Sequence, residues 1–311
     1  MVAAFKIVES GEFLITLGPS LREELACPDK HLLLKLRWNT PFPSEGKAVQ
    51  MDIVPRDGYF EAHVKILLPE PVWRNVGQTK AIDLGERNPV VMSDQSGRTE
   101  MFKGGMILSR LHYWNKEKAR VQGEVMERSG GKKDWSKSLS RMSHKGALQV
   151  GQAIHALTST VAEICAKDGT KEVVVGDLKG IKKEKDGKGK RWTDKPSQNW
   201  QQFPVRTLVA QLDNKLARHG IRLVEQDERG TSKGRCSLCG CTDRSKLHRV
   251  RRGFFHCESC GSYQNADENG ARNQIARYLH QESGLLSGGS SGSLADPRVW
   301  RWDDHRWSVV S

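Results

Sequence analysis

Two pairs of cysteines constrain this sequence more than any other feature. Cys236 and Cys239 form the first pair, Cys257 and Cys260 form the second, and 17 residues separate the pairs. Each pair has the spacing of a zinc knuckle. Two knuckles at this separation close one tetrahedral thiolate site, with the intervening chain folded back as a ribbon. Incidental cysteines or disulfides are the alternative. We predict a structural zinc ribbon.

The residues that follow the second pair carry the first candidate for catalysis. Asn265-Ala266-Asp267 opens a helical pattern immediately behind the zinc motif. A carboxylate that a rigid module fixes at the start of a helix is what a metal-dependent active site needs. Asp267 alone does not make such a site, so further carboxylates are expected elsewhere in the chain.

The charge of the chain points to a polyanionic partner. There are 50 basic and 37 acidic residues, a formal charge of +13, and basic residues cluster at 179–191 and 244–252. Nucleic acid is therefore the expected partner, and a merely soluble basic surface is the alternative. No apolar run is long enough to span a bilayer and no signal-peptide pattern is present, so we expect no membrane partner and a cytoplasmic location.

A carboxylate interrupts the first buried strand of the larger part of the chain. Residues 80–85 read Lys-Ala-Ile-Asp-Leu-Gly, and two further short strands are expected in hairpin succession at 88–93 and 98–102. Asp83 within this apolar run is costly unless it is paired or binds a metal ion. An aspartate on an edge strand that faces water is the alternative.

Helices and strands alternate over the rest of the chain. The spacing of apolar residues predicts a helical hairpin over 105–168, a strand at 172–178 that contains Asp177, a helix from 205 to 216 and a strand at 221–225. This order predicts an α/β fold with the ribbon inserted before the last helix.

Carboxylates at the ends of neighbouring strands and at the start of the last helix meet when such a sheet folds. Two divalent cations about 4 Å apart, held by these carboxylates, could clamp a phosphodiester, one activating water and the other stabilising the leaving oxygen. Carboxylate oxygens select Mg²⁺ or Mn²⁺, whereas the thiolate site selects Zn²⁺. We therefore expect two kinds of metal site, one catalytic and one structural.

Four segments occur in a fixed order around the cysteines: 81–85, 174–178, 231–233 and 265–271. Together with the cysteines they resemble the RuvC-type segments and zinc ribbon of the TnpB family. These transposon-encoded proteins are often labelled OrfB transposases and are related to the miniature type V CRISPR effectors. The resemblance covers residues 58–282.

The resemblance implies a fold and an activity. The fold is α/β, an RNase H-like (RuvC-type) nuclease domain with an inserted zinc ribbon, preceded by a small β-rich module. The activity is cleavage of DNA that pairs with an RNA guide transcribed from the transposon end. DNA and guide RNA are then the partners, and the prokaryotic nucleoid is the location. Family members are generally accessory to a separate recombining enzyme, which argues against a direct DNA-joining transposase.

One position departs from the family pattern. Family members usually place a glutamate directly before the Asp-Leu of the second segment, where this chain has Gly176. Asp177 is adjacent, but neighbouring strand residues point to opposite faces, so it does not simply take that role. Some relatives with glycine at this site carry their glutamate before the Thr-Ser pair, where this chain has Glu228.

We therefore predict that Asp83, Glu228 and Asp267 are the catalytic carboxylates, with Asp177 and Glu184 as alternatives to Glu228. The predicted function is a metal-dependent, RNA-guided DNA endonuclease. A nuclease-dead protein that still binds nucleic acid, as a repressor or a degenerate transposon remnant, is the alternative.

The expected domains follow the motifs. They are a β-rich, partial-barrel module at 1–79, the RuvC-like domain at 80–230 and 265–283, the ribbon at 231–264 and a flexible tail at 284–311. Family proteins carry a β-barrel interrupted by a helical module ahead of the first catalytic segment, and residues 1–79 are too few for both. We expect a shortened N-terminus, either in a degenerate fragment or in a compact variant that borrows contacts from its RNA or from a second copy in a homodimer.

Overall fold

The computed structural model describes residues 5–8, 12–35, 43, 45–56, 59–177, 202–251, 253–280, 297–303 and 305–310. The chain divides into two units, Met1–Glu70 and Pro71–Ser311. The division precedes residue 79 because the connection after Glu70 belongs to the second unit, where Arg74 donates hydrogen bonds to the carbonyls of Ala166 and Thr170. Within the described ranges, no helix is long and apolar enough to cross a membrane.

The first unit contains two small antiparallel sheets. Its elements are β1 (Phe5–Val8), β2 (Glu12–Thr16), α1 (Pro19–Glu24), β3 (His31–Lys35), β4 (Lys47–Pro55) and β5 (Phe60–Leu67). The strands β1, β2 and β3 form one sheet in that order, and β4 pairs with β5 in the other. Phe13, Ile15 and Leu17 are its buried apolar residues among those described. Five of the six elements described in this part of the chain, which is predicted to be β-rich, are strands.

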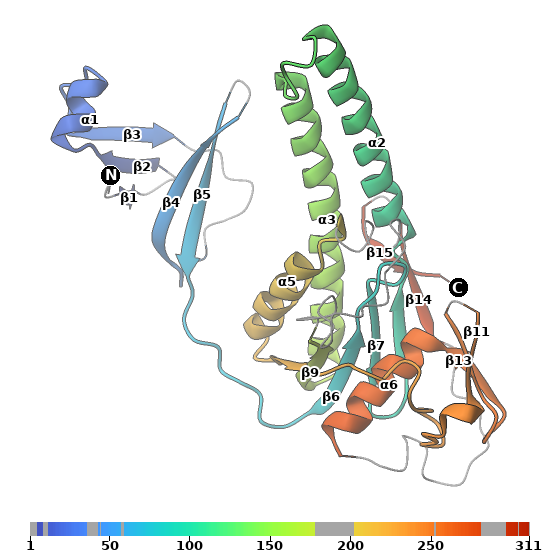
Figure 1. Cartoon of the computed structure of the whole chain (residues 1–311). Helices are drawn as coiled ribbons and strands as arrows, with labels where there is room; N and C mark the ends of the chain where they lie inside the picture. The colour runs from blue at the N-terminus through green and yellow to red at the C-terminus, as the bar shows by residue number, and fades with distance from the viewer. Residues whose placement is uncertain are drawn as a thin grey trace, which may run out of the picture. The chain divides into compact units, whose positions relative to one another are not determined.

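The second unit is built on a seven-stranded mixed sheet (Figure 1). Its strands are β6 (Gln78–Asp83), β7 (Val90–Asp94), β8 (Thr99–Phe102), β9 (Thr170–Gly176), β10 (Arg222–Gln226), β14 (Arg298–Trp302) and β15 (Trp307–Val309). They lie in the order β10-β9-β6-β7-β8-β14-β15. The strand β9 is parallel to both β6 and β10, so these three strands end at the same edge.

Helices cover both faces of this sheet. The helices are α2 (Gly105–Arg128), α3 (Lys137–Lys167), α5 (Val205–Arg218) and α6 (Ala266–Tyr278). Helices α2, α3 and α5 pack together on one face, and α6 lies across β6 and β7 on the other (Figure 1). The predicted hairpin strands, helical hairpin and α/β order are confirmed.

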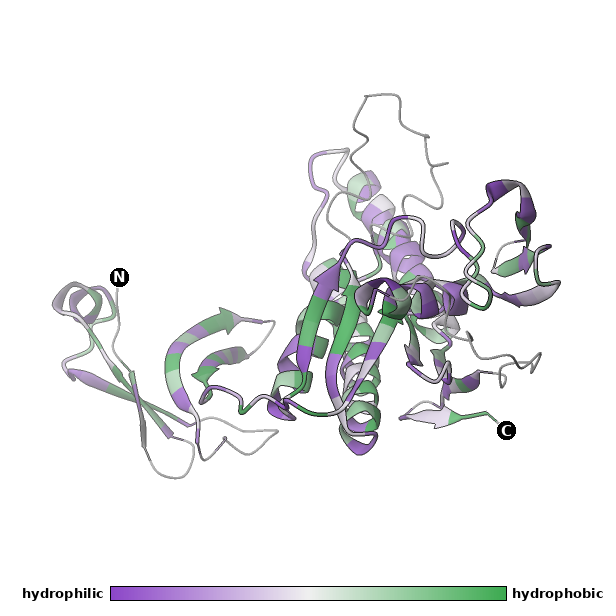
Figure 2. Ribbon diagram, turned by 90° about the horizontal axis from the view of Figure 1, so that it is seen from below, coloured by the Kyte–Doolittle hydropathy of each residue, from purple (hydrophilic) through white to green (hydrophobic). Residues whose placement is uncertain are grey.

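The period of two along the strands assigns residues to the two faces. Ile82 and Val175 belong to the large apolar core that α3 and α5 complete, whereas Ala81 and Val174 pack with Ile275 of α6. Each central strand accordingly has a short apolar stretch that contributes to both faces, Ala81-Ile82 in β6, Val90-Val91-Met92 in β7 and Val173-Val174-Val175 in β9, with polar residues beside it (Figure 2). Asp83 follows Ala81 by two positions, so its side chain lies on the α6 face.

The residues between β10 and α6 form a separate three-stranded ribbon. Its elements are the 3₁₀ turn η1 (Arg244–Lys246), β11 (Leu247–Arg251), β12 (Phe254–Cys257) and β13 (Ser262–Asn265). The strands pair antiparallel in the order β11-β12-β13. The last residue of β13, Asn265, is also the N-cap of α6, and Glu268 completes a capping box with it. The ribbon is thereby continuous with the helix that carries Asp267.

The C-terminal residues differ from the predicted flexible tail. Strand β14 pairs in parallel with β8, and β15 pairs antiparallel with β14. The reason is aromatic packing: Trp300 stacks on Phe102 with ring centroids 5.3 Å apart, and Trp307 meets the same ring edge-on at 5.5 Å. The indole of Trp300 also donates a 2.6 Å hydrogen bond to Glu100. Residues 281–296 lie outside the described residues.

Candidate active site and zinc centre

The four cysteines of the two pairs converge on one point. Their Sγ atoms all lie within 4.8 Å of one another, with Cys236 3.8 Å from Cys260 and Cys239 3.7 Å from Cys257. A tetrahedral zinc ion with bonds of about 2.3 Å requires sulfur–sulfur separations of about 3.8 Å. The donor set and its geometry therefore fit a structural zinc ion, and the separations exclude disulfide bonds.

Asp83 ends β6 directly beneath α6. A Cβ atom placed on Gly270 of α6 would lie 3.0 Å from the carboxyl carbon of Asp83, which is tighter than ordinary contact. The glycine thus lets the helix approach the strand end. Asp267 begins the same helix one turn earlier, so the approach brings the two carboxylates to the same edge of the sheet.

Glu228 reaches this edge from the loop that follows β10. Its carboxylate lies against Gly176, the last residue of β9: a Cβ at position 176 would be 2.1 Å from Glu228 Oε2. Ile82 pairs with Val175, so the next residues along the two strands, Asp83 and Gly176, are neighbours. Glu228 therefore fills the space that a side chain at position 176 would occupy.

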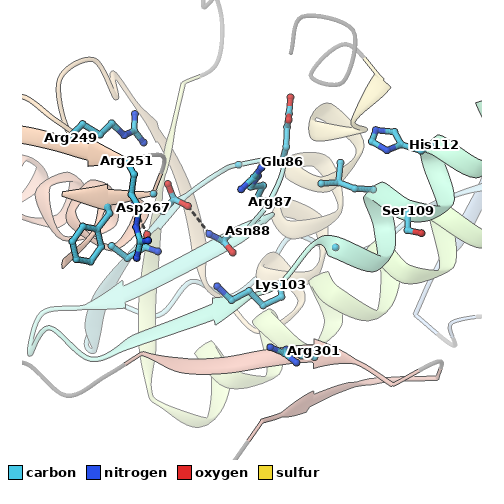
Figure 3. A pocket seen from close by; sticks show the side chains of 16 residues that line it. Glu86, Arg87, Asn88, Lys103, Ser109, His112, Arg249, Arg251, Asp267 and Arg301 are labelled. Atoms are coloured by element: carbon cyan, nitrogen blue, oxygen red, sulfur yellow. Dashed lines mark hydrogen bonds between the residues drawn. The ribbon is translucent and has the colours of Figure 1, made fainter. Parts of the chain in front are cut away.

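Asn88 holds the third carboxylate. It is buried in the β6–β7 connection, and its Nδ2 donates a 2.7 Å hydrogen bond to Asp267 Oδ2 (Figure 3). The backbone N–H of Asp267 donates to the N-cap side chain of Asn265 at 2.8 Å. Both ends of the aspartate are thus fixed, because the cap sets its backbone and Asn88 sets its carboxylate.

Asp267 and Glu228 both act electrostatically on Asp83. Burial raises the pKa of Asp83 well above its usual range, and the charges of Asp267 and Glu228 raise it further, while Arg249 opposes the shift. Burial also raises the pKa of Glu228 to about 7, with Asp227 and Asp177 adding to the effect. Acids crowded in this way repel one another when ionised, and a bound cation removes that repulsion. An all-oxygen set of this kind fits Mg²⁺ or Mn²⁺.

A basic cleft of about 1340 Å³ opens beside these acids. Figure 3 shows Arg249 and Arg251 extending from the ribbon, Lys103 from the end of β8 and Arg301 from β14, with Asp267 between them. Burial lowers the pKa of Lys103, and the negative charge of Asp267 offsets part of this decrease. A cleft that combines several cations with a carboxylate at its edge suits the backbone of a nucleic acid.

Buried amides join α6 to the start of the ribbon. Asn269 accepts a 2.8 Å hydrogen bond from the N–H of Ser237, and its Nδ2 donates to Arg235 O at 2.8 Å. Asn273 donates to the carbonyls of Thr231 and Arg235 at 2.7 and 2.8 Å. The segment before Cys236 is therefore fastened to the helix that carries Asp267.

The structure brings Asp83, Glu228 and Asp267 to one edge of the sheet. The charge of Asp177 raises the pKa of Glu228, so the two residues are close. Asp177 directly follows Gly176, however, and successive strand residues point to opposite faces, which assigns Asp177 to the face away from α6. Glu184 and the basic cluster at 179–191 lie outside the described residues. Arg249 and Arg251 of the second basic cluster line the cleft, as the expected nucleic-acid contact requires.

Sequence reasoning missed three residues of this region. Asn88 could have been suspected because it is a polar residue in the short turn that directly follows the Asp83 strand. Lys103 ends an apolar strand in the same way. Arg301 gave no such signal, since its place depends on the pairing of β14 with β8, about 200 residues earlier in the chain.

Two family models match the chain. The model OrfB_IS605, described as a probable transposase, matches residues 62–182, and the model described as the Cas12f1-like TNB domain matches residues 206–274. The two ranges together span more than half of the 311 residues. They cover the predicted first and second segments and the ribbon with the last helix.

Individual proteins also match. The CRISPR-associated endodeoxyribonuclease Cas12f1 of Sulfoacidibacillus thermotolerans is 29% identical over 119 residues, which are 38% of this chain and 25% of that relative. Its alignment thus takes in about a quarter of the relative's length.

Two solved structures are similar over larger ranges. A cryo-EM structure of a Cas12f1–sgRNA–target DNA complex has a TM-score of 0.45 at 16% identity, over 73% of this chain and 65% of that one. A CRISPR-Cas12f ternary complex has a TM-score of 0.45 at 19% identity, over 69% and 41%. The motif order and the two family models together make this chain similar to OrfB-type transposases and to Cas12f1, so the predicted resemblance to the TnpB family is confirmed.

Proposed function

We propose that this chain is a metal-dependent DNA endonuclease with a RuvC-type, RNase H-like active site, guided by an RNA. Asp83, Asp267 and Glu228 are the carboxylates that hold the catalytic cations. The observation that supports the proposal is that Asp267 and Glu228 lie near enough to Asp83, at the end of β6, for their charges to raise its pKa, and that Gly176 leaves room for Glu228.

The chain's own residues supply binding and orientation. Bound divalent cations would supply the activation of water and the stabilisation of the leaving oxygen. Asn88 orients the carboxylate of Asp267 through its hydrogen bond to Oδ2. Burial and the charges of Asp267 and Glu228 raise the pKa of Asp83, and a bound cation would favour its ionised form.

The cleft and the outer face of the ribbon form the proposed nucleic-acid interface. Lys103 and Arg301 contact phosphates beside the active site. On the ribbon, Tyr263 is 60% exposed and stacks on His256 with centroids 4.1 Å apart, while Arg251 lies 5.1 Å from the ring of Phe254. Exposed rings of this kind stack on unpaired bases without reading their sequence.

Sequence specificity comes from base pairing in this proposal. The similar Cas12f1 is described as an endodeoxyribonuclease, and one of the similar solved structures is described as a complex of Cas12f1 with sgRNA and target DNA. A guide RNA that pairs with the target would leave the protein to hold the duplex by its backbone, which agrees with the formal charge of +13.

The test uses protein purified with RNA expressed from the sequence that flanks its gene. We expect DNA that matches this RNA to be cut in Mg²⁺ or Mn²⁺, and Asp83→Ala to lose at least about 100-fold in rate, since removing a metal ligand removes transition-state stabilisation of several kcal/mol. The control is Asp213→Ala, which removes an exposed carboxylate of α5 on the opposite side of the sheet.

Two results would count against the proposal. Cutting that persists in Asp83→Ala would rule out the assigned centre. Tight binding of RNA and matched DNA with no cutting in any divalent cation would favour the nuclease-dead alternative, which the absence of a carboxylate at Gly176 supports.

A further inference from the structure

Glu228 differs from the other two carboxylates in how the fold holds it. Asp83 ends a central strand and Asp267 begins a helix, so regular hydrogen bonding fixes both backbones. Glu228 stands in the loop after β10, outside any helix or strand. A side chain on a loop keeps a catalytic geometry only if other groups restrain that loop.

The side chain of Arg277 restrains it from both sides. Its Nη1 donates to the carbonyl of Asp227, and its Nη2 donates to the carbonyl of Arg229 at 2.9 Å. These carbonyls belong to the residues immediately before and after Glu228. The carbonyl of Glu228 itself accepts a 2.7 Å hydrogen bond from Thr231 Oγ1. One guanidinium thus spans the residue that carries the carboxylate.

Helix α6 connects this clamp to the other half of the site. Asp267 lies in its first turn and Arg277 in its last, ten residues apart, which corresponds to about 15 Å along the helix. Near the same end, Gln226 Nε2 donates to Gln274 O at 3.3 Å. A single rigid element therefore sets Asp267 directly and the Glu228 loop through Arg277.

We propose that Arg277 is a positioning residue that holds Glu228 against Gly176, in place of the strand that carries the second glutamate in other family members. This inference rests on the proposed function, because it assigns Arg277 a role in the site that Asp83, Glu228 and Asp267 form. Lysine would serve poorly here: its single ammonium group makes no planar fork that reaches two separate carbonyls at once.

The first measurement is Mn²⁺ affinity, by calorimetry on the zinc-loaded protein. We expect Arg277→Ala to weaken binding by about 10-fold to 100-fold, the range for residues that orient a metal ligand. Arg277→Lys should fall between Arg277→Ala and the wild type. Arg229→Ala is the matched control, because it also removes one positive charge beside Glu228, whereas the ion pair of its side chain within the described part of the chain is a surface contact with Asp227.

A double-mutant cycle separates positioning from general stability. If Arg277 acts through Glu228, Arg277→Ala should cost little further affinity in a Glu228→Gln background. A residue that merely stabilises the fold would cost the same in both backgrounds. Amide hydrogen exchange in the metal-free protein gives an independent readout: exchange at residues 227–231 should be faster in Arg277→Ala, with exchange in β6 and β9 unchanged.

The outcomes distinguish this inference from the proposed function. If the wild type binds Mn²⁺ and Asp83→Ala does not, yet Arg277→Ala binds as the wild type does, the positioning role is wrong and the proposed function stands. Additive losses in the cycle would overturn the positioning role in the same way. If the wild type shows no Asp83-dependent binding, the proposed function fails and the inference fails with it.

Discussion

Substituting Gly176 by alanine should displace Glu228 from the active site. The added Cβ would lie 2.1 Å from Glu228 Oε2 and 2.9 Å from its Cβ and Cδ. Contacts below about 3 Å are not sustained, so the carboxylate must move by about 1 Å. Misplacement of a catalytic group by about 1 Å costs about 100-fold in rate, which corresponds to about 2.7 kcal/mol in the activation free energy.

The assay is single-turnover cleavage of matched DNA at saturating protein and Mg²⁺, so that the rate reports the chemical step. Gly123→Ala is the matched control, because a Cβ at that helical position meets nothing within 4 Å. A rescue variant supplies the carboxylate from the strand instead: Gly176→Glu combined with Glu228→Ala should cut faster than Gly176→Ala. The reasoning is refuted if Gly176→Ala cuts at the wild-type rate while keeping a folded, zinc-loaded structure.

Four further outcomes follow from the same contacts. Asn88→Ala should weaken Mn²⁺ binding about 10-fold to 100-fold by calorimetry, because it frees the Asp267 carboxylate; unchanged affinity would remove Asn88 from the site. Arg301→Ala should weaken DNA binding equally for all sequences and lower the slope of log affinity against log salt by about 0.9, the value for one phosphate contact; a sequence-dependent loss would argue for base contact. Cys236→Ser should lower zinc content and cleavage together, because the ribbon is fastened to α6; full cleavage without zinc would show that the two are independent. With zinc retained but without Mg²⁺ or Mn²⁺, the free energy of unfolding should fall by about 2 kcal/mol as pH rises from about 4.5 to about 7. The reason is that the pKa of Glu228 is raised to about 7, so over this range the folded state keeps a proton that the unfolded chain has released. Urea unfolding at both pH values checks this, and Glu228→Gln should make the free energy of unfolding less dependent on pH.

The parts of the site that depend on local pattern could be predicted from the sequence. The cysteine spacing predicts the convergence of four sulfur atoms, since a knuckle is a local structure. An aspartate within an apolar strand marks Asp83 because its burial is otherwise costly. The family pattern has a glutamate where this chain has Gly176, so the sequence indicates that a side chain is missing at this position. In the structure, the carboxylate of Glu228 occupies the space that this side chain would fill.

The parts that depend on distant pairing could not be predicted. Strand β14 brings Arg301 to the cleft only because Trp300 and Trp307 pack on Phe102, and no pattern within the C-terminal residues reveals that partner. The sequence predicts that a helix begins near Asp267, but apolar periodicity does not predict that this helix is buried on nearly all sides, since it carries Asn269 and Asn273. The explanation is tertiary: these amides satisfy backbone carbonyls of the ribbon.

The position of α6 in the chain also affects how the protein is made. Ala81, Val91 and Val174 lie on the sheet face that only α6 covers among the described helices, and α6 begins at Ala266. At about 5–20 residues per second, a ribosome needs roughly 10–40 s to pass from Asp83 to that helix. Until α6 has been synthesised, the strands made before it lack the helix that covers this apolar face. We therefore expect translation pauses over the ribbon codons to increase aggregation of the nascent chain and to lower the yield of folded protein.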